Sequence, residues 1–153
     1  MAFLQWRDEL DSGISVIDDQ HRRIVDMINQ LHEAQLRADA GVVATVIEEL
    51  VDYTLSHFAF EESMMEEAGY AFTRAHKRVH ELFIRRVGEY RERFVRGEDV
   101  ADELKSLLGR WLFNHILNDD RDYVGAVREN LTRLAAESNW LRRATKRFFL
   151  RTA

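Results

Sequence analysis

Apolar side chains recur every three or four residues along most of the chain, and short polar or glycine-containing segments divide this pattern into four long stretches. Such spacing predicts amphipathic helices, each with one apolar face. We place the four helices at about 18–37, 42–67, 73–96 and 99–116. Because the connecting segments are short, neighbouring helices should be antiparallel. The pattern therefore predicts an all-α fold, an up-down-up-down antiparallel four-helix bundle.

Two further segments flank this bundle. Residues 1–17 show no helical period, so we expect an extended N-terminal arm that packs on the bundle. A fifth amphipathic stretch covers about 122–150, with a break expected at Ser138–Asn139. We assign residues 1–125 to the bundle with its arm, and residues 126–153 to a C-terminal helical extension of the same domain.

Polar residues and glycines indicate where the helices begin and end. We expect Asp18 or Asp19 to cap the start of the first helix and Thr73 to cap the third. Gly69 should end the second helix and Gly97 the third, because glycine adopts the backbone conformation that follows many helices.

The composition limits the chemistry that the chain can carry. With 153 residues it is long enough for one domain with a sizeable core. It contains no cysteine, which excludes disulfides, thiolate metal sites and a cysteine nucleophile. Any metal must therefore be held by histidine and carboxylate, a donor set that suits iron, manganese, zinc or copper.

The net charge of −5 is unevenly distributed. Residues 139–153 contain five basic residues and no acid, so the rest of the chain carries −10. An acidic body argues against a general nucleic-acid binder. No apolar run approaches the ~18 residues that a membrane span needs. The N-terminus lacks the basic start and apolar core of a secretion signal, and we expect a cytoplasmic protein.

Histidines gather at one end of the predicted bundle. His57 with Glu61 and His76 with His80 are each spaced four residues apart, so each pair shares one helix face. In an antiparallel bundle the end of one helix lies beside the start of the next, which brings both pairs to the same level. Five of the six histidines reach this level on inward faces: His21, His57, His76, His80 and His115.

A metal explains these histidines better than ordinary packing does. A single inward histidine is usually a core residue with one hydrogen bond, and we interpret His32, which lies deeper, in this way. Burying five imidazoles without a metal would leave ring nitrogens unpaired, at roughly 1–3 kcal/mol each. Five exceed what one metal takes from a protein, so together with two carboxylates they suit two metals.

Near His115, the sequence offers Asp119, Asp120 and Asp122 as the second carboxylate. Asp119 follows His115 at i,i+4, whereas Asp120 at i,i+5 lies about 140° around an ideal helix. Spacing alone favours Asp119, and Asp120 would need a helix end or a distortion. We expect the other acids of the second helix to lie on a solvated face: Glu62, Glu66 and Glu67.

The motifs as a set resemble those of the hemerythrins, in particular the single-domain bacteriohemerythrins. The matching segments are IDDQH at 17–21, HFAFE at 57–61, HKRVH at 76–80 and HILNDD at 115–120. The resemblance covers about residues 3–125 and implies a di-iron site in a four-helix bundle. It implies one iron on His76, His80 and His115, and a second iron with an open position on His21 and His57. Glu61 and Asp120 would bridge the irons together with an oxo or hydroxo group.

The family pattern of histidine and aspartate at i,i+5 selects Asp120 over Asp119, against the helical argument. We therefore expect an irregular turn or helix end at 117–120. The resemblance implies reversible O2 binding for storage, delivery or sensing, and not an enzyme. Its apolar O2 pocket would be lined by Ile24, Phe58, Trp111, Leu112 and Ile116.

Two other classes of function stay open. The same centre could reduce peroxide or nitric oxide, or ligand binding could shift the C-terminal helix in a signalling response. Residues 139–153 carry Trp140, Phe148 and Phe149 beside the basic residues, more than the bundle itself needs. This segment is a candidate contact for a protein partner or a membrane surface. The alternative is that it packs on the bundle and its charges are solvated.

Overall fold

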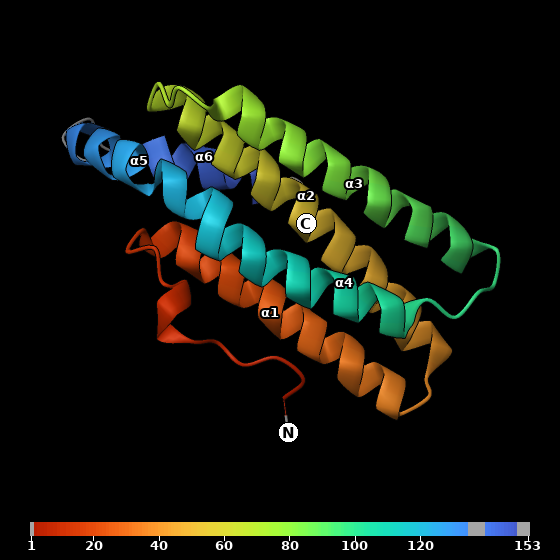
Figure 1. Ribbon diagram of the computed structural model, residues 1–153. Coiled ribbons are helices and arrows are strands. Elements are labelled where there is room, and N and C mark those ends of the chain that lie inside the picture. The colour runs from red at the N-terminus through yellow and green to blue at the C-terminus, as the bar shows by residue number, and fades with distance from the viewer. Residues whose placement is uncertain (1, 135–139, 150–153) are drawn as a thin grey trace.

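The computed structural model describes residues 2–134 and 140–149. Its long helices lie side by side and alternate in direction, with α1 against α2 and α4, and α2 against α3 (Figure 1). The predicted antiparallel four-helix bundle is confirmed. None of the described helices is long and apolar enough to cross a membrane. The four helices of the bundle are α1 (Ser15–Leu36), α2 (Ala40–Glu67), α3 (Thr73–Val95) and α4 (Ala101–Asn114).

Glycines end α2 and α3, as the sequence predicted. Gly69 has a φ of +66° and Gly97 a φ of +92°, in the left-handed region that favours glycine. After α2, the amides of Gly69 and Tyr70 donate to the carbonyl oxygens of Glu66 and Met65. These two bonds satisfy carbonyls that the end of the helix would otherwise leave unpaired.

The start of α1 differs from the prediction, because neither Asp18 nor Asp19 is its cap. The helix begins at Ser15, and Asp18 lies buried within the first turn. Its carboxylate accepts hydrogen bonds from the amides of Ser12 and Gly13 and from the Ser12 hydroxyl. Asp18 therefore holds the arm against the bundle.

The arm is extended apart from one short 3-10 turn, η1 (Asp8–Leu10). The amide of Leu4 donates to the side-chain oxygen of Asn29 on α1, and the Asn29 amide donates back to the Leu4 carbonyl. Thr73 is also not the cap that we expected, because it is the first residue of α3.

The irregularity expected near residues 117–120 is present, and it begins at His115. α4 continues through a π-helical segment, η2 (His115–Asp120), directly into α5 (Arg121–Leu134). A π-helix bonds residue i to i+5 and so needs one more residue for each turn. Asp120 can therefore face the same side as His115, which an ideal α-helix does not permit.

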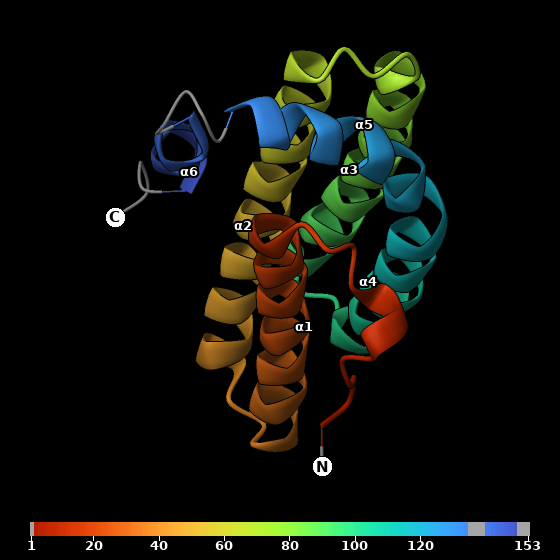
Figure 2. The ribbon, with the colours of Figure 1, turned by 90° about the vertical axis from the view of Figure 1, so that its left-hand side faces the viewer.

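α5 turns away from the axis of α4 and crosses beyond the start of α1 toward α2 (Figure 2). Its Tyr123 and Val127 are buried in a second apolar cluster with residues from the arm, α1 and α2. This cluster closes the histidine-rich end of the bundle. Its other fully or nearly buried members are Ile14, Ile17, Phe60, Met64 and Met65.

The last helix, α6 (Trp140–Phe149), lies against α2. The ring centroid of Phe149 is 5.2 Å from that of Tyr53 and 5.8 Å from that of Phe60. An apolar side of the extension thus contacts the bundle. The break expected at Ser138–Asn139 lies outside the described residues. Three basic side chains of α6 are exposed: Arg143, Lys146 and Arg147.

Candidate metal centre

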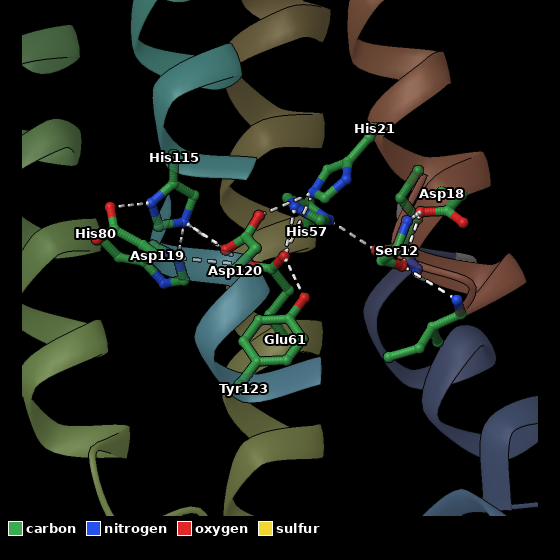
Figure 3. A network of polar contacts seen from close by, with 12 residues as sticks. Ser12, Asp18, His21, His57, Glu61, His80, His115, Asp119, Asp120 and Tyr123 are labelled. Carbon is green, nitrogen blue, oxygen red and sulfur yellow. Dashed lines mark hydrogen bonds and ion pairs between the residues drawn. The ribbon is translucent and has the colours of Figure 1, made fainter. Parts of the chain in front are cut away.

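The seven residues predicted as ligands meet in one buried cluster. Figure 3 labels His21, His57, Glu61, His80, His115 and Asp120 within it. We call His21 and His57 the two-histidine half, and His76, His80 and His115 the three-histidine half. Glu61 from α2 and Asp120 from η2 lie with them. As expected, the sixth histidine lies apart, since Nδ1 of His32 contacts Nζ of Lys105 at 2.9 Å.

The two carboxylates stand between the halves. Oε1 of Glu61 is 3.4 Å from Nε2 of His21, and Oε2 is 3.3 Å from Nε2 of His80. Oδ2 of Asp120 is 3.2 Å from Nε2 of His21, and Oδ1 is 2.9 Å from Nε2 of His115. Each carboxylate therefore presents one oxygen to each half, which is the arrangement of a bridge between two cations.

The outer ring nitrogens of three imidazoles contact protein oxygens. An acceptor at Nδ1 favours the tautomer with its proton on that nitrogen, which leaves a lone pair on the inner Nε2. Figure 3 shows that these inner nitrogens converge on the carboxylates. The outer pairs are His57 with Gln20 at 2.7 Å, His80 with Glu62 at 2.9 Å and His115 with Asp119 at 2.9 Å.

These contacts change the expected roles of two acids. Glu62 was expected on a solvated face, but it is partly buried and contacts His80. Asp119, which simple helical spacing favours, contacts the outer nitrogen of His115, while the buried Asp120 reaches the inside of the cluster. The remaining acids of α2 are exposed as expected: Glu66 and Glu67.

The inner atoms of the cluster are suited to cations. Nε2 of His80 lies 3.1 Å from that of His76 and 3.0 Å from that of His115, and lone pairs at such distances repel unless a proton or a metal cation lies between them. Several buried nitrogen and oxygen atoms of the cluster make no hydrogen bond. Most of them lie 2.9–4.0 Å from an ion-pair partner but lack the alignment of a hydrogen bond. Metal cations would satisfy these donors together. The buried atoms without a hydrogen bond to any described residue include both ring nitrogens of His21, Nε2 of His57, Oε2 of Glu61 and both carboxylate oxygens of Asp120.

The charges of the cluster also favour cations. Burial lowers the pKa of His21, but the nearby carboxylates of Asp120 and Glu61 more than offset this and raise it to about 9. The pKa of His76 is lowered by burial and raised by the same carboxylates, to about 10. Burial raises the pKa of Glu61, yet His57 and other imidazoles hold it well below its usual range. Without a metal the cluster therefore retains protons, which metal binding would displace.

Tyr123 belongs to the site, although the ligand motifs did not indicate it. Its fully buried hydroxyl donates to Oε1 of Glu61 at 2.9 Å. Burial, and then the charges of Glu61 and Asp120, raise the pKa of the phenol well above its usual value, so that it remains a donor. Its position three residues after Asp120, on one helix face, was the available signal. Gln20 carried no comparable signal beyond its place next to His21.

Two of the residues expected to line the O2 pocket lie against the three-histidine half. The ring of Phe58 stacks on His80 with centroids 4.0 Å apart, and the ring of Trp111 stacks on His115 at 4.3 Å. Phe83 completes this aromatic wall, since it stacks on Trp111 at 3.7 Å.

The other three expected lining residues are aliphatic and buried. Ile24 and Leu112 are buried in the main core, where they share a cluster with Phe58. Ile116 follows His115 and lines a pocket together with His21. All five residues thus lie in or beside the core that surrounds the metal centre.

Comparison with known proteins places this site in a family. The sequence profile of the Hemerythrin HHE cation binding domain matches residues 12–127. This chain belongs to the hemerythrin family. A bacteriohemerythrin of Pseudomonas aeruginosa is 64% identical over 152 residues, which cover 97% of this chain and 99% of that protein. A bacteriohemerythrin of Methylococcus capsulatus is 32% identical over 125 residues, which cover 80% of this chain and 95% of that protein.

A solved structure of the hemerythrin family has the same fold. The crystal structure of a wild-type hemerythrin matches with a TM-score of 0.78 at 30% identity, and covers 82% of this chain and 98% of that chain. The Pseudomonas relative spans most of the C-terminal extension, whereas the family profile ends at residue 127. The chain therefore carries a hemerythrin cation-binding domain, followed by an extension that some relatives share.

Proposed function

We propose that this chain binds O2 reversibly at two iron ions held by the seven-residue cluster. One observation carries the proposal: Glu61 and Asp120 each present one oxygen to the two-histidine half and the other to the three-histidine half. A pair of bridging carboxylates with five imidazoles suits two metals a few ångström apart. Membership of the hemerythrin family supports iron as the metal.

The two halves would hold their irons unequally. Three imidazoles and two bridging carboxylates would fill most positions of the iron in the three-histidine half. The iron in the two-histidine half would have two imidazoles and the same carboxylates, which leaves a position for a ligand. Two irons held by these residues would supply an O2-binding position and the electrons for reversible reduction of O2.

The protein would orient the donors and protect the site. The outer contacts from Gln20, Glu62 and Asp119 fix the rotation of three imidazole rings. Tyr123 donates to the Glu61 oxygen that faces His21, and so offsets part of its charge. The apolar side chains around the site would exclude water and slow irreversible oxidation: Ile24, Phe58, Trp111, Leu112 and Ile116.

The imidazole-rich donor set supports binding over turnover. Neutral imidazoles donate less charge than carboxylates, so they stabilise high oxidation states of iron less than carboxylate-rich di-iron enzymes do. The site has two carboxylates within its donor set of seven. We therefore propose O2 storage, delivery or sensing as the role of this site.

We also propose that residues 126–153 form part of the same domain. The contacts of Phe149 with Tyr53 and Phe60 support this, because they bury an apolar side of α6 against α2. The same contacts favour packing on the bundle over a free amphipathic helix that would dock elsewhere.

An optical spectrum of the reduced protein tests the proposal. The purified protein is reduced under argon, exposed to air, and returned to argon, and its iron content is measured. Two irons per chain and a band that appears in air and disappears under argon are expected. A single metal per chain, or no reversible band, would contradict reversible di-iron O2 binding. Sustained consumption of peroxide or nitric oxide with an electron donor would instead favour the enzymatic alternative.

A further inference from the structure

A pocket of about 70 Å³ lies between the N-terminal arm and the two-histidine half. Its buried wall includes His21 and Asp120, and its exposed rim includes Asp11 and Arg121. A volume of this size has room for a few small molecules such as water. The other lining residues are Leu10, Ser12, Ile116 and Val124. We call this cavity the access pocket.

His21, which lines this pocket, has an unsatisfied polar atom. The imidazole is fully buried, and its Nδ1 has no hydrogen-bond partner within the described part of the chain. Figure 3 shows one ring nitrogen of His21 facing Asp120 and Glu61, and the other facing away from them. A buried polar group without a partner costs about 1–3 kcal/mol. A water molecule that moved inward from the access pocket to this atom would satisfy it.

The rim of the access pocket is electrostatically suited to anions. The carboxylate of Asp11 is occupied by the guanidinium of Arg22 at 2.8 Å and by the indole N–H of Trp6 at 3.0 Å. Arg121 donates to the carbonyl oxygen of Glu9, which is a neutral acceptor. The charge of Arg121 therefore remains available to a passing anion.

The opposite side of the cluster is packed more tightly. The cavity between α2, α3 and α4 has a volume of about 10 Å³, and Phe58 lies between it and the histidines. Its wall is apolar, with members such as Phe83, Val87 and Leu108. Hydrophilic molecules gain no hydrogen bond from such a wall and would lose those that they make with water.

We propose that the access pocket is the route by which water and small inorganic anions reach the open metal position of the two-histidine half. The inference rests on the proposed di-iron centre, because that centre supplies the position to be reached. The arm covers the route through Leu10 and Ser12. A route changes the rates of entering and leaving by the same factor, so it alters kinetics and leaves the equilibrium affinity unchanged.

Azide, a small anion, is the probe for this route. Its binding to the oxidised, iron-loaded protein is followed by stopped-flow absorbance. Val124 lines the pocket and is half-buried, so Val124→Phe narrows the route and Val124→Ala widens it. We expect Val124→Phe to slow both association and dissociation roughly fivefold or more, with the Kd within about twofold of the parent. Val124→Ala should speed both steps.

The matched controls are Ile84→Phe and Ile84→Ala. Ile84 is 37% exposed and lines the cavity between α2, α3 and α4. Neither substitution should change the azide rates. As a second measurement, a crystal structure of the iron-loaded protein should show a water within hydrogen-bond distance of Nδ1 of His21.

The outcomes separate this inference from the proposed function. If the unmodified protein holds no iron or binds no azide, the proposed metal centre and the proposed access route are both wrong. If it binds azide and both Val124 variants keep the parent rates, the access pocket alone is wrong. Slower binding in Ile84→Phe instead of Val124→Phe would also overturn it, and would place the route between α2, α3 and α4.

Discussion

In the three-histidine half, the outer nitrogens of His80 and His115 contact the carboxylates of Glu62 and Asp119. In the two-histidine half, His57 contacts the neutral amide of Gln20, and Nδ1 of His21 has no partner among the described residues. Aromatic rings stack on the first half, whereas a pocket lined by both polar and apolar residues adjoins the second. The difference indicates that one half is built to hold its metal firmly and the other to admit a ligand.

Removing one imidazole from each half should give the largest contrast. His80→Ala should reduce iron to well below one per chain, because it removes an imidazole that is anchored by Glu62 and faces the bridging Glu61. His21→Ala should retain about one iron per chain and lose the reversible response to air. The control is His32→Ala, which lies outside the cluster and should keep two irons per chain. Equal iron loss in the variants of both halves, measured by elemental analysis, would remove the distinction.

The contacts at the outer ring nitrogens should also contribute more to metal affinity in the three-histidine half than in the two-histidine half. Their effect should be smaller than that of the imidazoles themselves. Glu62→Ala and Asp119→Ala remove charged partners of metal-facing imidazoles and should weaken metal binding about 10–100-fold. Gln20→Ala removes a neutral partner and should have a smaller effect. Competition with a chelator measures the affinities. The control is Glu66→Ala, since Glu66 is exposed and pairs with Lys77 instead of a histidine. A loss as large in this control would mean that only the overall charge matters.

The hydrogen bond from Tyr123 to Glu61 should affect the stability of the fold more than the metal content of the centre. Tyr123→Phe keeps the buried ring but leaves Oε1 of Glu61 without its donor. Loss of that bond should lower the free energy of unfolding of the metal-free protein by about 1–3 kcal/mol. Urea unfolding measures it. Tyr90→Phe, at a half-buried ring on α3, should change it by less than about 0.5 kcal/mol. Equal stability of the two variants would show that the bond to Glu61 contributes nothing.

The apolar surroundings should produce the smallest change. Leu112→Ala and Ile116→Ala remove buried aliphatic side chains near the centre and should speed autoxidation several-fold by admitting water. Trp111→Phe, on the side of the three-histidine half, should change the rate less. The decay of the oxygenated spectrum in air gives the rates. If neither alanine variant oxidises faster than the parent, water exclusion by these residues is not what protects the site.

Local features of the sequence predicted most of the fold. Gly69 and Gly97 mark two helix ends because the left-handed backbone that follows a helix is a property of one residue. The start of α1 was predicted wrongly for the opposite reason. Asp18 accepts hydrogen bonds from Ser12 and Gly13 in the arm, so its role depends on a tertiary contact that spacing does not reveal.

The site, too, was predictable where it depends on local spacing and not where it depends on tertiary contacts. The spacing of histidines identified the inward faces, and the structure brings all five together. Helical geometry favoured Asp119 over Asp120 because it assumed an unbroken α-helix, and the π-helical segment reverses that choice. The contacts of Glu62 and Tyr123 depend on how α2, α3 and α5 are rotated against one another. No pattern within a single helix contains that information.

Anomalous diffraction at the iron absorption edge, on a crystal of the iron-loaded protein, tests the central claim most directly. We expect two peaks a few ångström apart, one beside His21 and His57 and the other among His76, His80 and His115. Glu61 and Asp120 should each place one oxygen beside the first peak and the other oxygen beside the second. One peak alone, or two peaks that share neither carboxylate, would contradict a di-iron centre with unequal halves.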